Sequence, residues 1–238
     1  MNDSVDVGML RDIQRLHADE VASFAQAGDW LTGEERTAIV QHARNVRVQA
    51  GLQNVGHDSY EIDAESLLPT GLTDLIGRVA TSPKNLERDD YERCRRTGMT
   101  AGEYAEVVGL VSRAVNVDVF ARAMGTSTSP LCPPASDEPA YPEIDAAAEE
   151  GAWLPSVPCG QAGGELGASI YGGAMVPFIY RAVSLSPQEA RRVITAGDTQ
   201  YLTLDRFFDF DYSLHDGLSR AQVETLAARV SAYNECFY

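Results

Sequence analysis

The chain has 238 residues, 44% of them hydrophobic and 23% charged, which is ordinary for a globular protein with one large domain or two small ones. Its formal net charge of −16 disfavours binding to nucleic acid or to an anionic membrane surface, because both repel an acidic protein. No apolar run reaches the roughly 18 residues that a membrane span needs. The acidic N-terminus lacks the charged-then-apolar order of a signal peptide, so we expect a cytoplasmic protein.

Capping boxes mark the beginnings of several predicted helices. In this motif a Ser or Thr and a Glu or Gln three residues later satisfy two free backbone N–H groups. The boxes are Thr32/Glu35, Thr100/Glu103, Ser186/Glu189 and Ser219/Gln222. Apolar residues follow at helical spacing and strand-like alternation is scarce, so we predict an all-α fold. The expected helices cover residues 8–27, 33–50, 72–80, 87–97, 101–124, 168–183, 187–198 and 220–236.

Prolines interrupt the helical pattern between residues 125 and 167, because proline cannot continue a helix. Residues 137–150 carry acids and no base, which is typical of a solvated connector. The segment could instead wrap across a partner subunit, with Trp153 as its anchor. Residues 160–167 are rich in glycine and are expected to form a flexible loop. We therefore predict an N-terminal helical half (1–125), a Pro/Gly-rich acidic linker (126–167) and a C-terminal helical half (168–238).

Two residues of the first half could take part in acid–base chemistry. His42 titrates near working pH and could be a general base, or it could simply face solvent on its helix. Asp118 lies in an otherwise apolar helical segment, so it either faces solvent or belongs to a functional pocket. His57 and Asp58 could orient one another or form half of a metal site, but they are too few to make one. No cofactor or metal site is expected.

The cysteines Cys94, Cys132, Cys159 and Cys236 are widely spaced, without a zinc-ligand pattern, so we expect free thiols. Glu224 and Cys236 are separated by eleven residues on the last predicted helix. On one straight helix they would lie about 18 Å apart along the axis. A site that used both would need groups from other helices or from a partner chain.

The passage QVETLAARVSAYNECFY at residues 222–238 resembles the redox motif of the alkylhydroperoxidase-like (carboxymuconolactone decarboxylase) family. That motif is Glu, eleven residues, Cys, two residues, Cys, three residues, His. Glu224 and Cys236 match its first two members; the second Cys would fall one residue beyond Tyr238, and the His four residues later still. Residues 32–36, 81–125, 151–158 and 181–187 are also similar to the two-domain, peroxidase-related branch, so the resemblance covers most of the chain.

The resemblance implies an alkylhydroperoxidase-like helical bundle of two related halves, assembled as a homo-oligomer. It implies thiol-dependent peroxide reduction, with Cys236 as the thiol and Glu224 as its proton relay. Three explanations of the incomplete motif stay open. The chain is shorter than the gene product; or it lost the redox pair and became a decarboxylase, isomerase or lyase that needs no cofactor, using His42, Asp118 or Glu224; or it is a non-catalytic binding protein.

The expected partner is a small molecule, either a peroxide or a hydrophobic or aromatic metabolite. Aromatic residues crowd the last third of the chain. Most of them are expected in the core, because aromatic side chains bury a large apolar area. An apolar pocket near Cys236 would suit a hydrophobic ligand.

Overall fold

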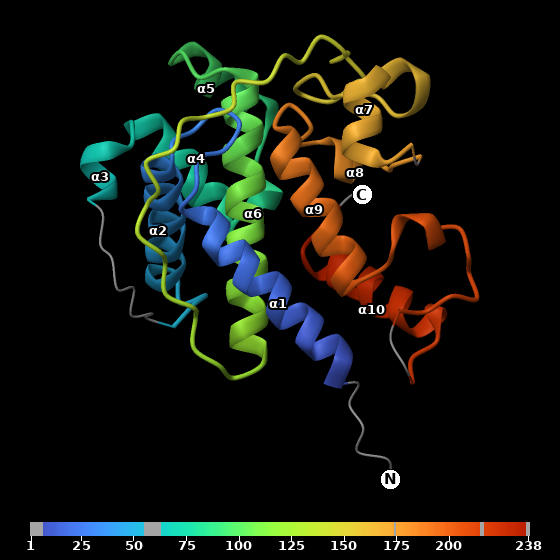
Figure 1. Cartoon of the computed structure of the whole chain (residues 1–238). Coiled ribbons are helices and arrows are strands. Elements are labelled where there is room, and N and C mark those ends of the chain that lie inside the picture. The colour runs from blue at the N-terminus through green and yellow to red at the C-terminus, as the bar shows by residue number, and fades with distance from the viewer. Residues whose placement is uncertain (1–6, 55–62, 174, 215–216, 237–238) are drawn as a thin grey trace.

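The structure is a computed structural model that describes residues 7–54, 63–173, 175–214 and 217–236 (Figure 1). Within these ranges every regular element is a helix. Ala148 and Ser156 form an isolated antiparallel β-bridge. The predicted all-α class is confirmed. None of the helices in these ranges combines the length and apolar character needed to cross a bilayer.

Helix α6 (Ala101–Ala123) runs through the middle of the molecule (Figure 1). On one side it packs against α2 (Gly33–Gln49), α4 (Thr70–Thr81) and α1 (Val7–Phe24), and on the other against α9 (Pro187–Gln200). The short helices α3 (Ala64–Leu67), η1 (Pro83–Asn85) and α5 (Arg88–Arg96) surround this bundle. Its core is aliphatic and aromatic, and includes the fully enclosed side chains of Phe24, Ile39, Ile76 and Leu110.

The capping boxes at Thr32, Thr100 and Ser219 are confirmed, since each side chain accepts a hydrogen bond from the third helical residue. The box predicted at Ser186 is wrong, although α9 does begin there. The Ser186 hydroxyl instead donates to the Asp29 carboxylate (2.6 Å), which also accepts from the Gln188 N–H (2.8 Å). A residue between α1 and α2 therefore caps the first turn of α9.

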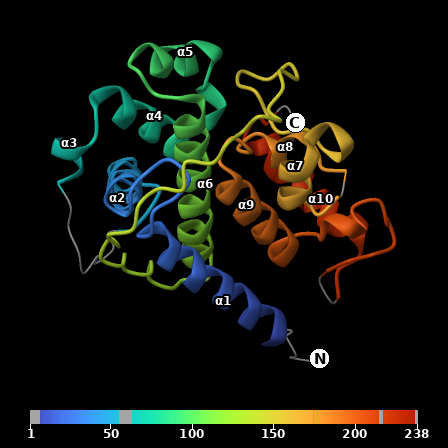
Figure 2. The same cartoon turned by 45° about the horizontal axis from the view of Figure 1, so that its top comes forward.

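The segment that follows α6 lies along the N-terminal bundle (Figure 2). The N–H groups of Ala135 and Tyr141 donate to carbonyls of the loop between α1 and α2, at 2.7 and 2.8 Å. Leu131 is buried in the core of the N-terminal bundle, and Trp153 packs against the same core. The segment is thus attached to the core at Leu131 and Trp153, while within residues 137–150, the predicted solvated connector, nearly all side chains are exposed or half-buried. Trp153 anchors the segment to its own chain.

The helix predicted at 168–183 is wrong. Helix α7 (Gly164–Tyr171) ends where Gly172 and Gly173 adopt positive φ angles of 61° and 81°, and α8 (Phe178–Arg181) is a separate turn after Pro177. The glycine-rich stretch is not an irregular loop either: it forms the 3₁₀ helix η2 (Gly160–Gly163) and the start of α7. With α9, these elements enclose a second core around Val157, Ile170, Val183 and Ala190.

Helix α10 (Arg220–Tyr233), which follows the short η3 (Leu204–Arg206), is the most exposed helix of the C-terminal region. Val223 is buried, but Leu226, Val230 and Tyr233 of the same predicted apolar face are 58%, 59% and 89% exposed. The aromatic residues of the last third are also mostly outside the core: Phe208 and Phe210 are exposed, and the other described ones between Phe178 and Tyr212 are half-buried. Their predicted burial is wrong. Phe237 and Tyr238 lie outside the described residues.

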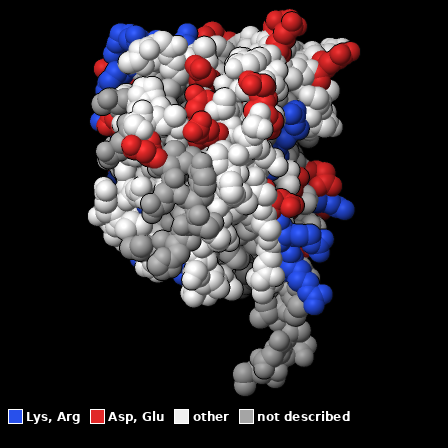
Figure 3. Space-filling model, turned by 60° about the vertical axis from the view of Figure 1, so that its left-hand side comes forward, with Lys and Arg blue, Asp and Glu red and all other residues white. Residues whose placement is uncertain are grey.

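On the face drawn in Figure 3, acidic side chains are scattered over the upper part, and acidic and basic side chains lie next to one another along the right-hand edge. The described residues on that face form no continuous basic strip of the kind that tracks a nucleic-acid backbone.

Candidate functional site

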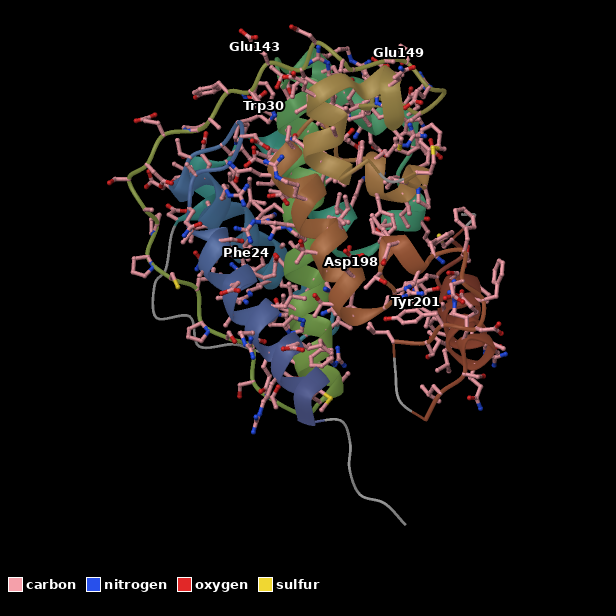
Figure 4. All side chains as sticks on the ribbon, turned by 45° about the vertical axis from the view of Figure 1, so that its right-hand side comes forward. Phe24, Trp30, Glu143, Glu149, Asp198 and Tyr201 are labelled. Atoms are coloured by element: carbon pink, nitrogen blue, oxygen red, sulfur yellow. The ribbon has the colours of Figure 1, made fainter. Side chains whose placement is uncertain are left out.

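Glu224 lies near the start of α10 and is held by two side chains. The Tyr201 hydroxyl donates to one carboxylate oxygen at 2.7 Å, and Arg220 Nε donates to the other at 2.5 Å. Arg220 is itself buried and donates to the carbonyls of Phe207 and Asp209, both at 3.2 Å. Tyr201 stands beyond the end of α9 and faces the segment that holds α10 (Figure 4). The cluster thus ties the start of α10 to α9.

The hydrogen bonds fix the protonation states of this cluster. Burial alone would raise the pKa of Glu224, but the hydrogen bonds from Tyr201 and Arg220 outweigh it, so the pKa of Glu224 is lowered. Burial raises the pKa of Tyr201 to about 12, and the hydrogen bond to Glu224 adds to this rise. At neutral pH the pair is therefore a carboxylate and a protonated phenol. Glu224 can accept a proton, and Tyr201 can donate a hydrogen bond.

Cys236 lies past the last turn of α10. The chain turns at Glu235, where φ is 53°, and the Cys236 N–H closes the turn onto the Ser231 carbonyl at 2.9 Å. Glu235 pairs with Lys84 of η1 at 2.6 Å, so the exposed thiol sits where the end of α10 meets η1. Glu224 lies on the second turn of α10 and Cys236 lies beyond its last residue, Tyr233; the nine steps from Glu224 to Tyr233 alone span about 13 Å along the helix axis. The structure does not bring them together.

Asp118 does not face solvent. It is 2% exposed and receives two hydrogen bonds from Arg44, from Nε and Nη2, both at 2.9 Å. Gln53 donates a third at 3.1 Å and in turn accepts from Arg47 Nε at 3.2 Å. Both Asp118 oxygens are occupied by donors, so the cluster holds α2 against α6.

His42 is half-buried on α2, and its ring has no hydrogen-bond or charged partner among the described residues. His57 and Asp58 lie outside those residues. Nowhere in the described ranges do three residues of the types that bind metals gather into a possible metal site.

A buried ion network, which sequence reasoning missed, joins four helices. Arg113 of α6 donates to Glu189 of α9 from Nε (2.7 Å) and Nη2 (2.8 Å), and also pairs with Glu20 of α1. Arg36 of α2 donates to Glu189 at 3.1 Å and pairs with Glu106 of α6. All five side chains are at most 4% exposed. One signal was available: Glu106 and Arg113 interrupt the buried apolar face of α6 two turns apart.

The two central acids of this network differ in protonation. Burial raises the pKa of Glu106 to about 7, and the nearby Glu189 carboxylate adds to the rise, while Arg36 opposes it. Burial would likewise raise the pKa of Glu189, but Arg113 and Arg36 outweigh it and the pKa is lowered. Glu106 is thus an acid that titrates near neutrality. Its side chain is fully buried, so we expect its titration to change the stability of the folded protein.

A small pocket of about 70 Å³ lies between α4 and α5, with Cys94 among its lining residues. Two arginines and two aspartates line it and neutralise one another: Arg78 pairs with Asp90 at 3.1 Å, and Arg93 pairs with Asp90 at 3.1 Å and with Asp74 at 3.4 Å. Burial raises the pKa of the Cys94 thiol, which disfavours the thiolate. This cysteine is unsuited to act as a nucleophile.

Comparison with known proteins finds no matching family model, no similar curated protein and no similar solved structure.

Proposed function

We propose that the chain is an alkylhydroperoxidase-like, peroxidase-related protein that reduces peroxides through the Cys236 thiol. The observation that carries the proposal is the exposure of this thiol at the end of the helix on which Glu224 is held as a carboxylate. Of the other cysteines, Cys94 is buried and Cys132 and Cys159 are half-buried. The proposal includes a bundle of two related halves, assembly as a homo-oligomer, and the reducing cytoplasm as its setting.

The proposed step begins with attack of the Cys236 thiolate on one oxygen of a hydroperoxide. The S–O bond forms as the O–O bond breaks, and the departing alkoxide takes a proton to give an alcohol. An external dithiol then reduces the sulfenic acid: one thiol displaces water, and the second displaces Cys236 and leaves the reductant as a disulfide. Glu224 is the proposed proton relay that converts the thiol to the thiolate. Because it lies too far from Cys236 for direct transfer, the relay requires groups from other helices or from a partner chain.

The test is peroxide consumption in the presence of an added dithiol. We expect Cys236→Ser to abolish turnover, and Glu224→Gln to reduce it by about 100- to 10,000-fold. Cys132→Ser is the matched control and should turn over at the rate of the unchanged protein. Unchanged turnover in Cys236→Ser would refute the assignment. Cys and His codons after Tyr238 in the reading frame would supply the rest of the motif.

The second candidate is an acid–base enzyme of the decarboxylase, isomerase or lyase type that needs no cofactor. It is favoured by the pairing of the Glu224 carboxylate with the Tyr201 phenol, which provides an acid–base couple without a thiol. Its substrate would be a small hydrophobic or aromatic molecule. This reading predicts turnover that survives Cys236→Ser and is lost in Tyr201→Phe. Binding of such a molecule with no product formed would instead indicate a binding protein.

A further inference from the structure

The loop between α1 and α2, residues 25–31, holds two distant parts of the chain in place; we call it the Trp30 loop. Its carbonyls accept hydrogen bonds from the N–H groups of the segment 135–141, in the pairs Ala25–Ala135 (2.7 Å), Gly28–Ala140 (3.0 Å) and Asp29–Tyr141 (2.8 Å). The Trp30 indole N–H donates to the Leu185 carbonyl just before α9, at 2.8 Å. If this loop moved, the segment 135–141 and the start of α9 would lose these contacts.

The Glu106 carboxylate of α6 binds the Trp30 loop from the inside. Its Oε2 accepts the Trp30 backbone N–H at 2.6 Å, and its Oε1 accepts from Arg36 Nη1. The loop backbone lies directly on the carboxylate, because a Cβ added to Gly28 would overlap Glu106 Oε1. Both oxygens therefore serve as acceptors at once. A protonated carboxyl group cannot do this equally well, because one of its oxygens carries a hydrogen and becomes a donor.

Charged groups reach Glu106 and its ion network from every element packed around it. They are Arg36 of α2, Arg113 of α6, Glu189 and Arg192 of α9, Glu20 of α1, and Asp29 in the Trp30 loop itself. Glu189 accepts from two guanidinium groups, whereas Glu106 accepts from one. Of these two acids, Glu106 is therefore the one that takes up a proton more readily.

We propose that Glu106 is a pH-sensitive switch, which holds the Trp30 loop when it is ionised and releases the loop when it is protonated. After protonation one oxygen still accepts from Arg36, but the Trp30 N–H has lost its acceptor. The loop then moves away from α6 together with the segment 135–141. Tyr141 of this segment has a φ of 45°, which is rare for a residue other than glycine, so its departure also relieves backbone strain.

The direction of the switch follows from linkage. The hydrogen bond from Trp30 lowers the pKa of Glu106, so the carboxyl group binds a proton more tightly once the loop has moved away. Acidification must therefore favour the released loop. Because burial raises the pKa of Glu106 to about 7, the change falls near neutral pH. The switch does not involve Cys236, so it can be tested apart from peroxide reduction.

The test uses the fluorescence of Trp30 in the full chain. The sequence has two tryptophans, so Trp153→Phe leaves Trp30 alone. We expect quenching of Trp30 by acrylamide to increase as the pH is lowered, in one transition of about two pH units centred near pH 7. Addition of Glu106→Gln should give strong quenching at every pH. The control is His42→Gln, which removes a group of α2 that titrates in the same range and should leave the transition unchanged.

Hydrogen exchange of the unchanged protein decides the question if Glu106→Gln does not fold. Between about pH 8 and pH 6, the protection of the Ala135, Ala140 and Tyr141 amides, corrected for the exchange rate of an unfolded chain, should fall about tenfold. The Leu110 amide in the middle of α6 should keep its protection. Quenching or protection that does not change with pH would overturn the proposal. So would the same transition in a folded Glu106→Gln protein, or its loss in His42→Gln.

Discussion

Replacing Glu189 with Gln removes a negative charge from the centre of the buried ion network while keeping nearly the same volume. The carboxylate accepts three hydrogen bonds from two guanidinium groups, at 2.7, 2.8 and 3.1 Å. An amide accepts through its oxygen only, and its NH₂ group would face donors. Arg36 and Arg113 would then be balanced by Glu20 and by Glu106, which is partly protonated near pH 7.

The expected cost follows from removing one partner of a fully buried ion pair, which destabilises a protein by about 3–5 kcal/mol. Total stabilities are about 5–15 kcal/mol, so this is a large share. For a chain of this size, the same change lowers Tm by about 6–20 °C. The loss should lower the denaturant concentration at the midpoint of unfolding. The m-value, which is the slope of the unfolding free energy against denaturant concentration, should not change, because the surface exposed on unfolding is the same.

The assay is urea unfolding at pH 7, followed by circular dichroism. The control is Glu235→Gln, which removes the same charge from the exposed pair with Lys84, whose side chains are 42% and 68% exposed. Exposed pairs contribute at most about 1 kcal/mol. If Glu189→Gln costs no more than Glu235→Gln, the network does not stabilise the contact between α6 and α9 as we argue.

Two further predictions concern the same network. In unfolding experiments, Gly109→Ala should destabilise the protein by about 1–3 kcal/mol, because the added Cβ would lie 2.8 Å from the Cβ of Glu189. The control is Gly77→Ala on α4, where the added Cβ meets no atom within 4 Å and should stabilise the protein by about 0.4–1 kcal/mol. The pKa of Glu106 is about 7 in the folded protein and about 4.3 in the unfolded chain. The raised pKa therefore stabilises the folded state fully below about pH 4.3, and this stabilisation is lost as the pH rises toward 7. Glu106→Gln should therefore reduce the fall in stability measured between about pH 5 and 8, and an equal fall in both proteins would contradict this.

Signals that are local in sequence predicted structure well. The capping boxes at Thr32, Thr100 and Ser219 formed because both members lie within one turn of helix, so no other part of the chain is needed. The box at Ser186 failed because Asp29, 157 residues away, offers its carboxylate to the same turn. Glu189, which the sequence assigned to that box, is the central acid of the buried network instead.

The candidate site was less predictable, because its partners come from distant segments. The spacing of Glu224 and Cys236 was readable, but the hydrogen bond from Tyr201 depends on how α9 meets α10. The sequence showed that Asp118 was unusual, but not that Arg44, 74 residues away, would hold both of its oxygens. The apolar stripe of α10 was also visible, yet helical periodicity shows which side chains share a face and not what covers them.

The residues of the buried ion network are synthesised far apart in time, which affects when the network can form. Arg113 leaves the ribosome 76 residues before Glu189, its main partner. At 5–20 residues per second, the interval is about 4–15 s. During that time α1, α2 and α6 can approach one another, but Arg36 and Arg113 face two carboxylates instead of three. The network that the structure shows can therefore be complete only after α9 has been synthesised.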